Sequence, residues 1–124
     1  MRALILDFKD DKPIYLQVAE NIENDILKGN LEEGTQVPST NQMAVMYKIN
    51  PATSGKGINQ LVDRGILYKR RGIGMFVAPG AKEKIINERK KEFYKKHIAA
   101  LLEEARILGI RTDEIADMIR KEGG

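Results

Sequence analysis

The apolar positions of residues 13–29 repeat at the spacing of an amphipathic helix. Pro13 opens this segment and Gly29 closes it. The apolar residues between them share one helical face: Ile14, Val18, Ile22, Ile26 and Leu27. The pattern predicts a first helix with one buried side. The apolar stretch before it, Met1–Phe8, is short and interrupted by Asp7, which favours a short strand over a secretory signal.

A second helix is predicted from a capping signal. Ser39 is followed three residues later by Gln42, the pattern in which each side chain bonds to the backbone of the other residue. The apolar residues Met43, Met46 and Tyr47 continue at helical spacing. We therefore expect a helix that starts at Ser39 and runs to about Tyr47.

A third helix is predicted to begin at Asn50 and Pro51, an N-cap followed by proline at the first helical position. It continues to about Arg64 and is stopped by Gly65. One face is apolar and packs on the domain: Ile58, Leu61 and Val62. The other face is free: Ala52, Thr53, Lys56, Asn59 and Gln60. Together the second and third helices form a helix-turn-helix, whose second member can enter a major groove.

Two short apolar runs directly after the third helix predict a β-hairpin, which we call the wing. Ile66–Arg70 and Ile73–Val77 are its expected strands, and Arg71 and Gly72 form the turn between them. Glycine supplies the positive φ that a tight turn requires. The residues Pro79-Gly80 then mark a domain boundary.

The residues after this boundary predict a long helix from Ala81 to Leu108 that is rich in lysine and glutamate. Its apolar positions step by four, three, four and three residues: Tyr94, Ile98, Leu101, Ala105 and Leu108. This heptad spacing is typical of helices that pack on a second helix, so we expect these residues to form a dimer interface. Gly109 ends the helix, and a last short helix is expected from about Thr112.

These elements predict an α+β fold in two parts, a winged helix-turn-helix domain at residues 1–78 and a helical dimerisation tail at residues 79–124.

A chain of 124 residues has no room for a large enzyme core, and no apolar run approaches the length of a membrane span. Cysteine is absent, which removes disulfides, zinc–thiolate sites and cysteine nucleophiles from consideration. We expect a cytoplasmic protein.

The net charge of +3 is small, but its distribution along the chain is uneven. Residues 1–47 carry four basic and eight acidic side chains, whereas residues 48–71 carry six basic side chains and one acidic side chain. The third helix and the wing therefore form the electropositive part of the chain. Such a segment is either a solvated surface or a surface for nucleic acid.

Three patterns that suggest enzyme chemistry fail when their spacing is examined. The sequence Ser54-Gly55-Lys56-Gly57 lacks the earlier glycine and the following serine or threonine of a phosphate loop. Its two glycines are better explained by close packing of the third helix. Gly72-Ile73-Gly74 lacks the rest of a dinucleotide fingerprint, and His97 is the only histidine. We predict no catalytic residue, no metal site and no cofactor.

The order of elements and several spaced motifs resemble the GntR family of bacterial regulators, and its YtrA subfamily in particular. The resemblance lies in the stretch PIYLQVAENIENDILKGNLEEGTQVPS, in INQLVDRGILYKRRGIGMFV, and in the short helical tail. It implies a winged helix that binds double-stranded operator DNA as a homodimer, usually as a repressor. Members of this subfamily often lie beside transporter genes, which suggests control of a small transporter-linked operon.

The resemblance places candidate DNA contacts at the starts of the second and third helices. Ser39 matches a position associated with the DNA backbone, and Asn50 and Thr53 match polar positions near the DNA. Asn41 stands where many members have an arginine that contacts DNA. Arginines that are common in the wider family are also replaced at Pro51 and Gly55, so the base contacts of the family do not transfer to this chain.

The remaining DNA-binding candidates are basic. Lys56 is the only cation on the free face of the third helix, and we assign it a groove or phosphate contact. Arg71 and Gly72 match the wing tip, where the family reaches toward the minor groove, and Lys69 and Arg70 can touch flanking phosphates.

Two alternatives remain at this stage. The lost arginines also fit a winged-helix interaction module that no longer binds DNA, although the basic segment 48–71 argues against it. A separate effector domain does not fit in the residues after Gly80, so a small-molecule effector would have to use the dimer interface.

Overall fold

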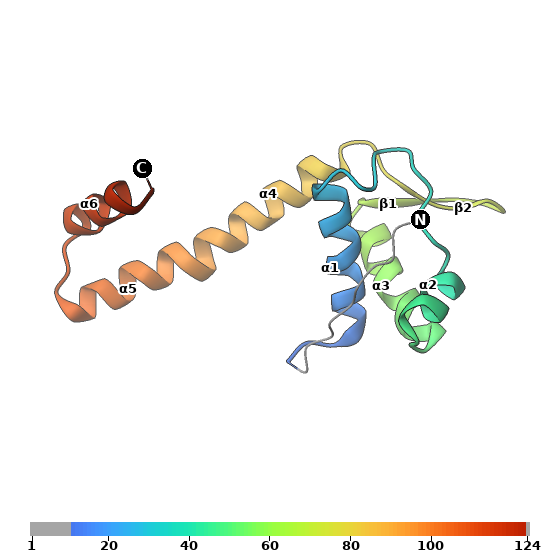
Figure 1. The fold of residues 1–124 in the computed structure, drawn as a ribbon, viewed down its shortest axis with the longest axis horizontal. Coiled ribbons are helices and arrows are strands. Elements are labelled where there is room, and N and C mark those ends of the chain that lie inside the picture. The colour runs from blue at the N-terminus through green and yellow to red at the C-terminus, as the bar shows by residue number, and fades with distance from the viewer. Residues whose placement is uncertain (1–10, 124) are drawn as a thin grey trace. The chain divides into compact units, whose positions relative to one another are not determined.

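The computed structural model describes residues 11–123, so the predicted strand Met1–Phe8 lies outside the described residues. The chain forms two compact units, one that ends at Ile86 and one that begins at Asn87. The elements in chain order are α1 (Ile14–Leu27), α2 (Thr40–Tyr47), α3 (Pro51–Asp63), β1 (Leu67–Arg70), β2 (Gly74–Val77), α4 (Ala81–Phe93), the π-helical turn η1 (Tyr94–Ile98), α5 (Ala99–Leu108) and α6 (Thr112–Gly123) (Figure 1). The predicted α+β class is confirmed.

The first three helices begin where their sequence signals predicted. Pro13 precedes the first residue of α1. Ser39 and Gln42 form the reciprocal cap of α2, in which the Gln42 backbone N–H donates to Ser39 Oγ over 3.1 Å and the Ser39 N–H donates to Gln42 Oε1 over 2.8 Å. Asn50 caps α3, because its Oδ1 accepts from the Ala52 N–H over 2.8 Å. These helix boundaries are set by local chemistry.

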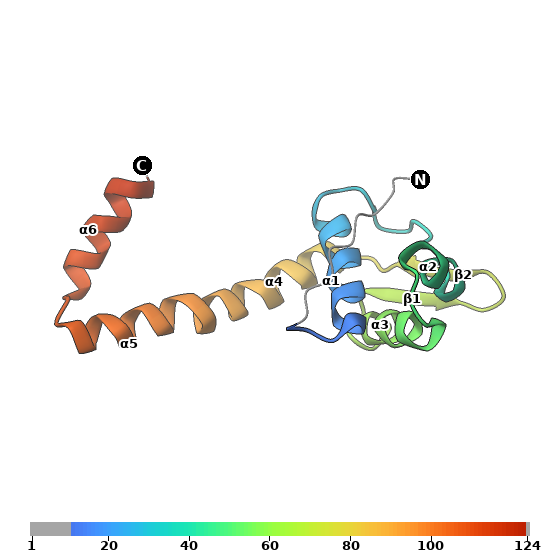
Figure 2. The same cartoon turned by 60° about the horizontal axis from the view of Figure 1, so that its bottom comes forward.

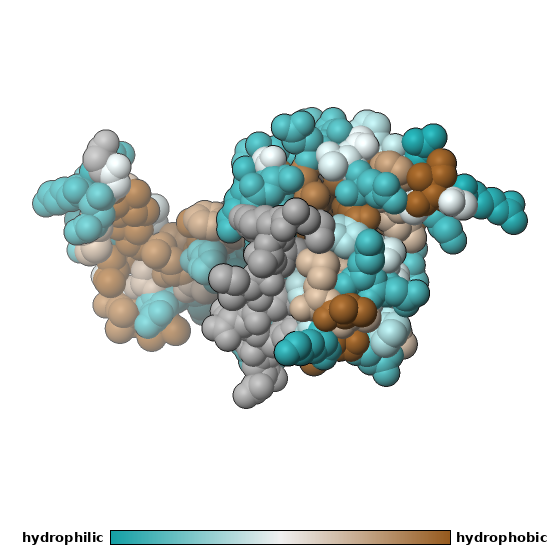
Figure 3. Space-filling view, turned by 45° about the vertical axis from the view of Figure 1, so that its right-hand side comes forward, coloured by the Kyte–Doolittle hydropathy of each residue, from teal (hydrophilic) through white to brown (hydrophobic). Residues whose placement is uncertain are grey.

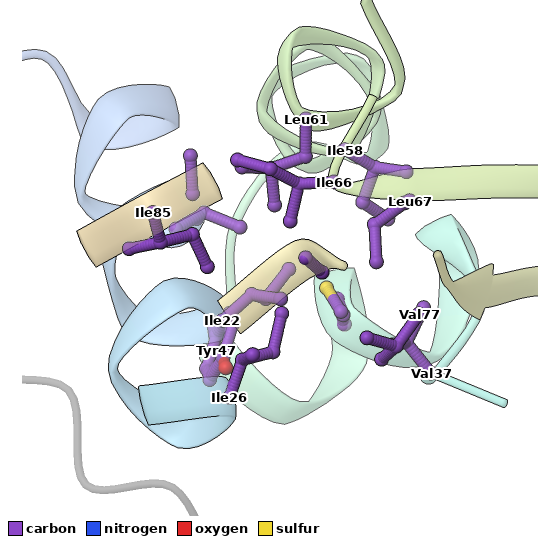
Figure 4. Close-up of a cluster of buried hydrophobic side chains, with 14 residues drawn as sticks. Ile22, Ile26, Val37, Tyr47, Ile58, Leu61, Ile66, Leu67, Val77 and Ile85 are labelled. Carbon is purple, nitrogen blue, oxygen red and sulfur yellow. The ribbon is translucent and has the colours of Figure 1, made fainter. Parts of the chain in front are cut away.

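The core of the first unit is formed where α1, α2 and α3 meet the base of the hairpin (Figure 4). Side chains from distant parts of the chain meet there, and fourteen of them are buried in one cluster: Val18, Ala19, Ile22, Ile26, Val37, Met43, Tyr47, Ile58, Leu61, Ile66, Leu67, Val77, Ala81 and Ile85. Burial of this much apolar surface is the main stabilising contribution to the unit. Ala81 and Ile85 belong to α4, so the first unit includes residues beyond the predicted boundary at 78/79.

Gly57 allows α1 and α3 to pack at close range, as the sequence predicted. A Cβ atom at Gly57 would lie 2.7 Å from the backbone oxygen of Tyr15 and 3.2 Å from the Val18 side chain. The space is therefore filled by neighbouring backbone, which cannot rotate away. Gly55 differs, because a Cβ atom there would meet the methyl group of the Thr40 side chain, at 3.3 Å.

We expect Gly57→Ala to destabilise the protein by about 1–3 kcal/mol, as other overpacked cores do. Gly55→Ala is the matched control, since it adds the same methyl group to the same helix. Its clash is with a side chain that can shift, and alanine favours a helix over glycine by roughly 1 kcal/mol. Chemical denaturation of both variants provides the comparison. Equal stability of the two would show that the contact with Tyr15 does not limit the packing of α3.

The wing is a two-stranded antiparallel hairpin (Figure 2). Its turn is one residue longer than expected. Leu67 pairs with Val77 at its base and Arg70 pairs with Gly74 at its end, which leaves Arg71, Gly72 and Ile73 as the turn. Ile73 belongs to the turn because its N–H donates to the Arg70 carbonyl over 2.9 Å. Gly72 has φ 76°, which confirms that the turn needs glycine.

The second unit contains an interruption that the sequence did not predict. The helix expected to run without a break from Ala81 to Leu108 contains the π-helical turn η1, after which the Ala99 N–H donates to the Tyr94 carbonyl, five residues earlier. Gly109 then ends α5 with φ 73°, as predicted. α6 starts at the expected Thr112, and the Arg111 N–H preceding it donates to the Glu114 carboxylate over 3.3 Å.

Tyr47 links the core to the pH dependence of stability. Its ring is buried, and burial, followed by the negative charge of Asp25, raises the pKa of Tyr47 from 10.0 to about 12. The unfolded chain therefore loses this proton at lower pH than the folded chain. The contribution to stability is complete below pH 10.0 and is lost as the pH rises toward about 12.

We expect the unfolding free energy of the wild type, relative to that of Tyr47→Phe, to be constant below pH 10.0 and to fall above it. Urea unfolding at a series of alkaline pH values measures this difference. A difference that stays constant up to about pH 12 would contradict the raised pKa.

Candidate nucleic-acid interface

The starts of α2 and α3 lie next to each other. Ser54 Oγ donates to the Thr40 carbonyl over 2.8 Å, and Gly55 lies against the Thr40 methyl group. Ser39 and Asn50, both predicted to contact DNA, are exposed on this side and act as helix caps. The first backbone N–H groups of each helix point along its axis and out of its N-terminal end, so this region favours anions.

The predicted free face of α3 is only partly exposed, since Gln60 is half-buried, and a residue of α1 that the sequence did not single out lies against it. Lys56 is exposed and Thr53 is half-buried. Lys56 Nζ lies 4.1 Å from the centroid of the Tyr15 ring, a cation–π contact between α3 and the start of α1. Tyr15 was part of the motif that suggested the family. Only the tertiary structure shows that its ring lies beneath the cation of the third helix.

A shallow hollow runs along this face of α3. Its lining combines Tyr15 with exposed and half-buried residues of the helix: Ala52, Gly55, Lys56, Asn59, Gln60 and Asp63. Asn41, the other polar candidate, is exposed in the first turn of α2. A polar helix surface of this kind suits contact with base edges and phosphates.

The wing carries the predicted basic residues on its outer half. Lys69, Arg70 and Arg71 are all exposed. The Arg70 guanidinium carbon lies 5.2 Å from the centroid of the Phe76 ring, which in turn stacks on Tyr68 with centroids 5.8 Å apart. Arg71 has no acidic partner among residues 11–123, and it stands at the tip beside Gly72. The two arginines therefore have different surroundings.

Gln36 connects the wing to the start of α2, and no signal in the sequence had singled it out. Its Nε2 donates to the Ile73 carbonyl in the wing turn over 3.0 Å. Three residues later the chain reaches Ser39, the cap of α2. The wing tip is thus joined to the start of α2 through Gln36 and the three residues that follow it, and the start of α2 is joined to α3 by the hydrogen bond from Ser54 to Thr40. We call these three regions together the candidate DNA surface.

The predicted dimerisation residues are only partly exposed in the single chain. Tyr94, Leu101 and Leu108 are 59%, 41% and 64% exposed, whereas Ile98 is half-buried and Ala105 is buried. Apolar residues gather on the surface of the second unit (Figure 3). They line a hollow between α5 and α6 whose apolar members are Ala100, Leu101, Ala105, Leu108, Ile110, Ile115, Met118 and Ile119.

The described part of the chain, residues 11–123, holds no cluster of three or more histidine, aspartate or glutamate side chains that could bind a metal ion. In the same residues no helix has both the length and the apolar character needed to cross a membrane.

Comparison with known proteins identifies the class to which this surface belongs. Residues 14–77 match the model for the gntR family of bacterial regulatory proteins, so the chain belongs to this family. It is 32% identical over 119 residues to the HTH-type transcriptional regulator YhcF of Bacillus subtilis, with 94% of this chain and 97% of that protein covered. It is 27% identical over 116 residues to the transcriptional repressor YtrA of the same organism, with 94% and 88% covered.

Solved structures agree with this assignment. A GntR-family transcriptional regulator from Bacteroides thetaiotaomicron superposes with a TM-score of 0.76 at 38% identity, covering 87% of this chain and 94% of that chain. The DNA-binding domain of AraR, solved in complex with the operator ORX1, superposes with a TM-score of 0.53 at 30% identity, covering 60% and 92%. The protein is a DNA-binding transcription regulator and, like its relatives, not an enzyme.

Proposed function

We propose that this protein is a homodimeric repressor that binds an inverted-repeat operator through the candidate DNA surface. The proposal rests on two hydrogen bonds at either end of the segment 36–40, Gln36 to Ile73 in the wing turn and Ser54 to Thr40 between the helix starts, so that this segment joins two helix starts and a basic wing. A major-groove helix flanked by a basic hairpin meets both requirements of DNA recognition, base contacts and phosphate contacts.

The expected contacts are to phosphates, to base edges in the major groove and to the minor groove. Ser39, Asn41 and the wing residues Lys69 and Arg70 hold phosphates, which fixes the position of the protein on the duplex. The start of α3 reads base edges in the major groove, and its side chains that reach the DNA are Asn50, Thr53 and Lys56. Arg71 and Gly72 extend the wing tip to the minor groove.

Lys56 is the residue of α3 whose side chain is ordered before it meets DNA. The Tyr15 ring beneath it limits the conformations of a long side chain, so less entropy is lost when the ammonium group meets DNA. A cation held in this way is suited to a phosphate or to a guanine edge at one place in the groove. It partly replaces the arginines that the chain lacks at positions 41, 51 and 55.

Dimerisation is assigned to the tail. The second unit is small, and its apolar residues Leu101, Leu108, Met118 and Ile119 are at least 41% exposed. A second copy of the same tail would remove these side chains from water, and the two-fold axis would set the spacing of the operator half-sites. The predicted interface comprises Tyr94, Ile98, Leu101, Ala105 and Leu108.

The hollow between α5 and α6 is also the place for a small-molecule effector, because it adjoins this interface. Three polar residues, Lys96, His97 and Glu104, line the hollow together with its apolar side chains. The similarity to the repressor YtrA supports a role in repression. We expect the target to be a small operon linked to a transporter. The protein would act in the cytoplasm, where the operator is.

The proposal is tested by gel-shift titration with the DNA upstream of the protein's own operon, against an unrelated duplex of equal length. We expect tighter binding to the upstream DNA and a steep loss of affinity with salt. Equal, salt-insensitive and weak binding to both duplexes would favour a winged-helix interaction module that does not bind DNA.

A further inference from the structure

The segment Thr35–Val37 forms an additional strand position beside the wing. The Val77 N–H donates to the Thr35 carbonyl over 2.9 Å, and the Val37 N–H donates to the Met75 carbonyl over 2.9 Å. Gln36 lies opposite Phe76 in this pairing. Since β1 pairs with one edge of β2, this segment pairs with the other edge. The backbone of Gln36 is thereby fixed against the strand that leads back from the wing tip.

The Gln36 side chain lies across Gly74 to reach the wing turn. A Cβ atom at Gly74 would be 2.6 Å from Gln36 Nε2 and 3.5 Å from its Cδ. The side chain therefore occupies space that any residue other than glycine would fill. Gly74 also has φ 144°, a backbone conformation that residues with a Cβ rarely adopt. The glycine and the glutamine form a matched pair.

Gln36 contacts the wing tip at the backbone of Ile73. Its carbonyl accepts the hydrogen bond from Gln36 Nε2 over 3.0 Å, and its N–H donates to the Arg70 carbonyl over 2.9 Å. Both polar groups of its backbone are thus engaged. Ile73 is directly adjacent to Gly72 and two residues from Arg71, so the position of the tip depends on this residue.

We infer that Gln36 is a positioning residue for DNA binding, which fixes the wing tip relative to the start of α2 and so orients Arg71 before the duplex arrives. The inference rests on the proposed DNA-binding function. A two-stranded hairpin is only marginally ordered by its own hydrogen bonds. A tie from a third segment reduces the conformational freedom that the tip would otherwise lose on binding.

A second role for Gln36 must be separated from this one, because an exposed glutamine can also contact DNA directly. Both roles predict weaker binding when the amide is removed. They differ in their dependence on Arg71. A positioning residue acts through the tip, so its effect disappears when the tip arginine is absent. A direct contact contributes whether Arg71 is present or not.

The experiment is a double-mutant cycle with Gln36→Met and Arg71→Gln, measured by fluorescence anisotropy on a duplex of the protein's own upstream DNA. Methionine keeps the length of the side chain and removes its N–H donor. We expect Gln36→Met to weaken binding about two- to tenfold, the range of one lost hydrogen bond. In the Arg71→Gln background we expect no further loss.

Lys56→Gln is the matched control for the cycle, because it removes a proposed DNA contact on α3 that is independent of the wing turn. Its effect and that of Gln36→Met should be additive. Equal losses from Gln36→Met with and without Arg71 would overturn the positioning role and leave a direct contact. A wild type that binds neither this duplex nor an unrelated one would instead contradict the proposed function.

Backbone ¹⁵N relaxation of the free protein tests the same inference without DNA. We expect lower order parameters at residues 71–74 in Gln36→Met than in the wild type, with no change in α3. Order parameters at the tip that match the wild type would overturn the inference, whatever the duplex experiments show.

Discussion

Removal of Arg71 is expected to make the fall of log affinity with log salt less steep by about 0.9 for each half-site, the value for one neutralised phosphate that releases its counterions. Arg71 is exposed at the wing tip and has no acidic partner in the described residues, so its charge is available to DNA. If Arg71 enters the minor groove, the affinity of Arg71→Ala will fall further on operators with AT-rich flanks. A narrow minor groove has a more negative potential.

The measurement is a salt titration of Arg71→Ala on the upstream operator, on a version with GC-rich flanks and on random duplex. Lys82→Ala is the control, since it removes an exposed positive charge in α4, outside the candidate DNA surface. The control should keep the slope of the wild type. An unchanged slope and affinity for Arg71→Ala on all three duplexes would remove the wing tip from the mechanism.

Charge in the tail hollow is expected to abolish the dimer and with it most of the operator affinity. Leu101 and Leu108 are 41% and 64% exposed, so aspartate at both positions leaves the folded single chain largely intact but places charges in the proposed interface. Linking two half-site contacts raises affinity by roughly 10² or more, and a monomer loses this gain. We therefore expect at least about a 100-fold loss of operator affinity.

Sedimentation equilibrium and anisotropy of the Leu101→Asp/Leu108→Asp variant measure the two effects together. Ile107→Asp is the matched control, because Ile107 is 76% exposed on the same helix and does not line the hollow. The control should remain dimeric. A double variant that sediments as a dimer and binds the operator normally would place the interface elsewhere.

The elements of the first unit follow from short-range signals, which is why the sequence was sufficient to predict them. Ser39 with Gln42, and Asn50 with Pro51, determine helix starts through contacts within four residues. Close packing against backbone explains Gly57, whereas Gly55 faces a side chain that can shift. Gly57 lies against backbone of α1 and Gly55 against Thr40.

The features that the sequence did not reveal depend on contacts between distant segments. Gln36 and Ile73 are 37 residues apart, and the ring beneath Lys56 comes from α1. Neither Gln36 nor Tyr15 is marked in the sequence as a contact of these residues by a hydrophobic period or a helix-capping pattern. The π-helical turn at Tyr94–Ile98 was missed for a different reason, since its residues fit an ordinary helix and a heptad pattern equally well. The turn shifts the helical phase between Tyr94 and the residues of α5, so the predicted stripe is not one straight row.

The proposed division of recognition between α3 and the wing is supported by their different chemistry. α3 presents small polar residues and one ordered cation, which suits a groove that must be approached closely. The wing presents three cations with no acidic neighbour on its strands, which suits phosphates and the minor groove. Variants of Thr53 should therefore change which sequence is preferred, whereas variants of Lys69 should weaken all duplexes alike.

The central claim is that duplex DNA binds the surface formed by the starts of α2 and α3 and by the wing tip. It is tested most directly by adding the upstream duplex to ¹⁵N-labelled protein and following every backbone amide. The account predicts that the largest shifts fall in residues 39–42, 50–56 and 69–73 at saturation. Shifts confined to α6 and the hollow beside it, or none in these three segments while the duplex is bound, would contradict it.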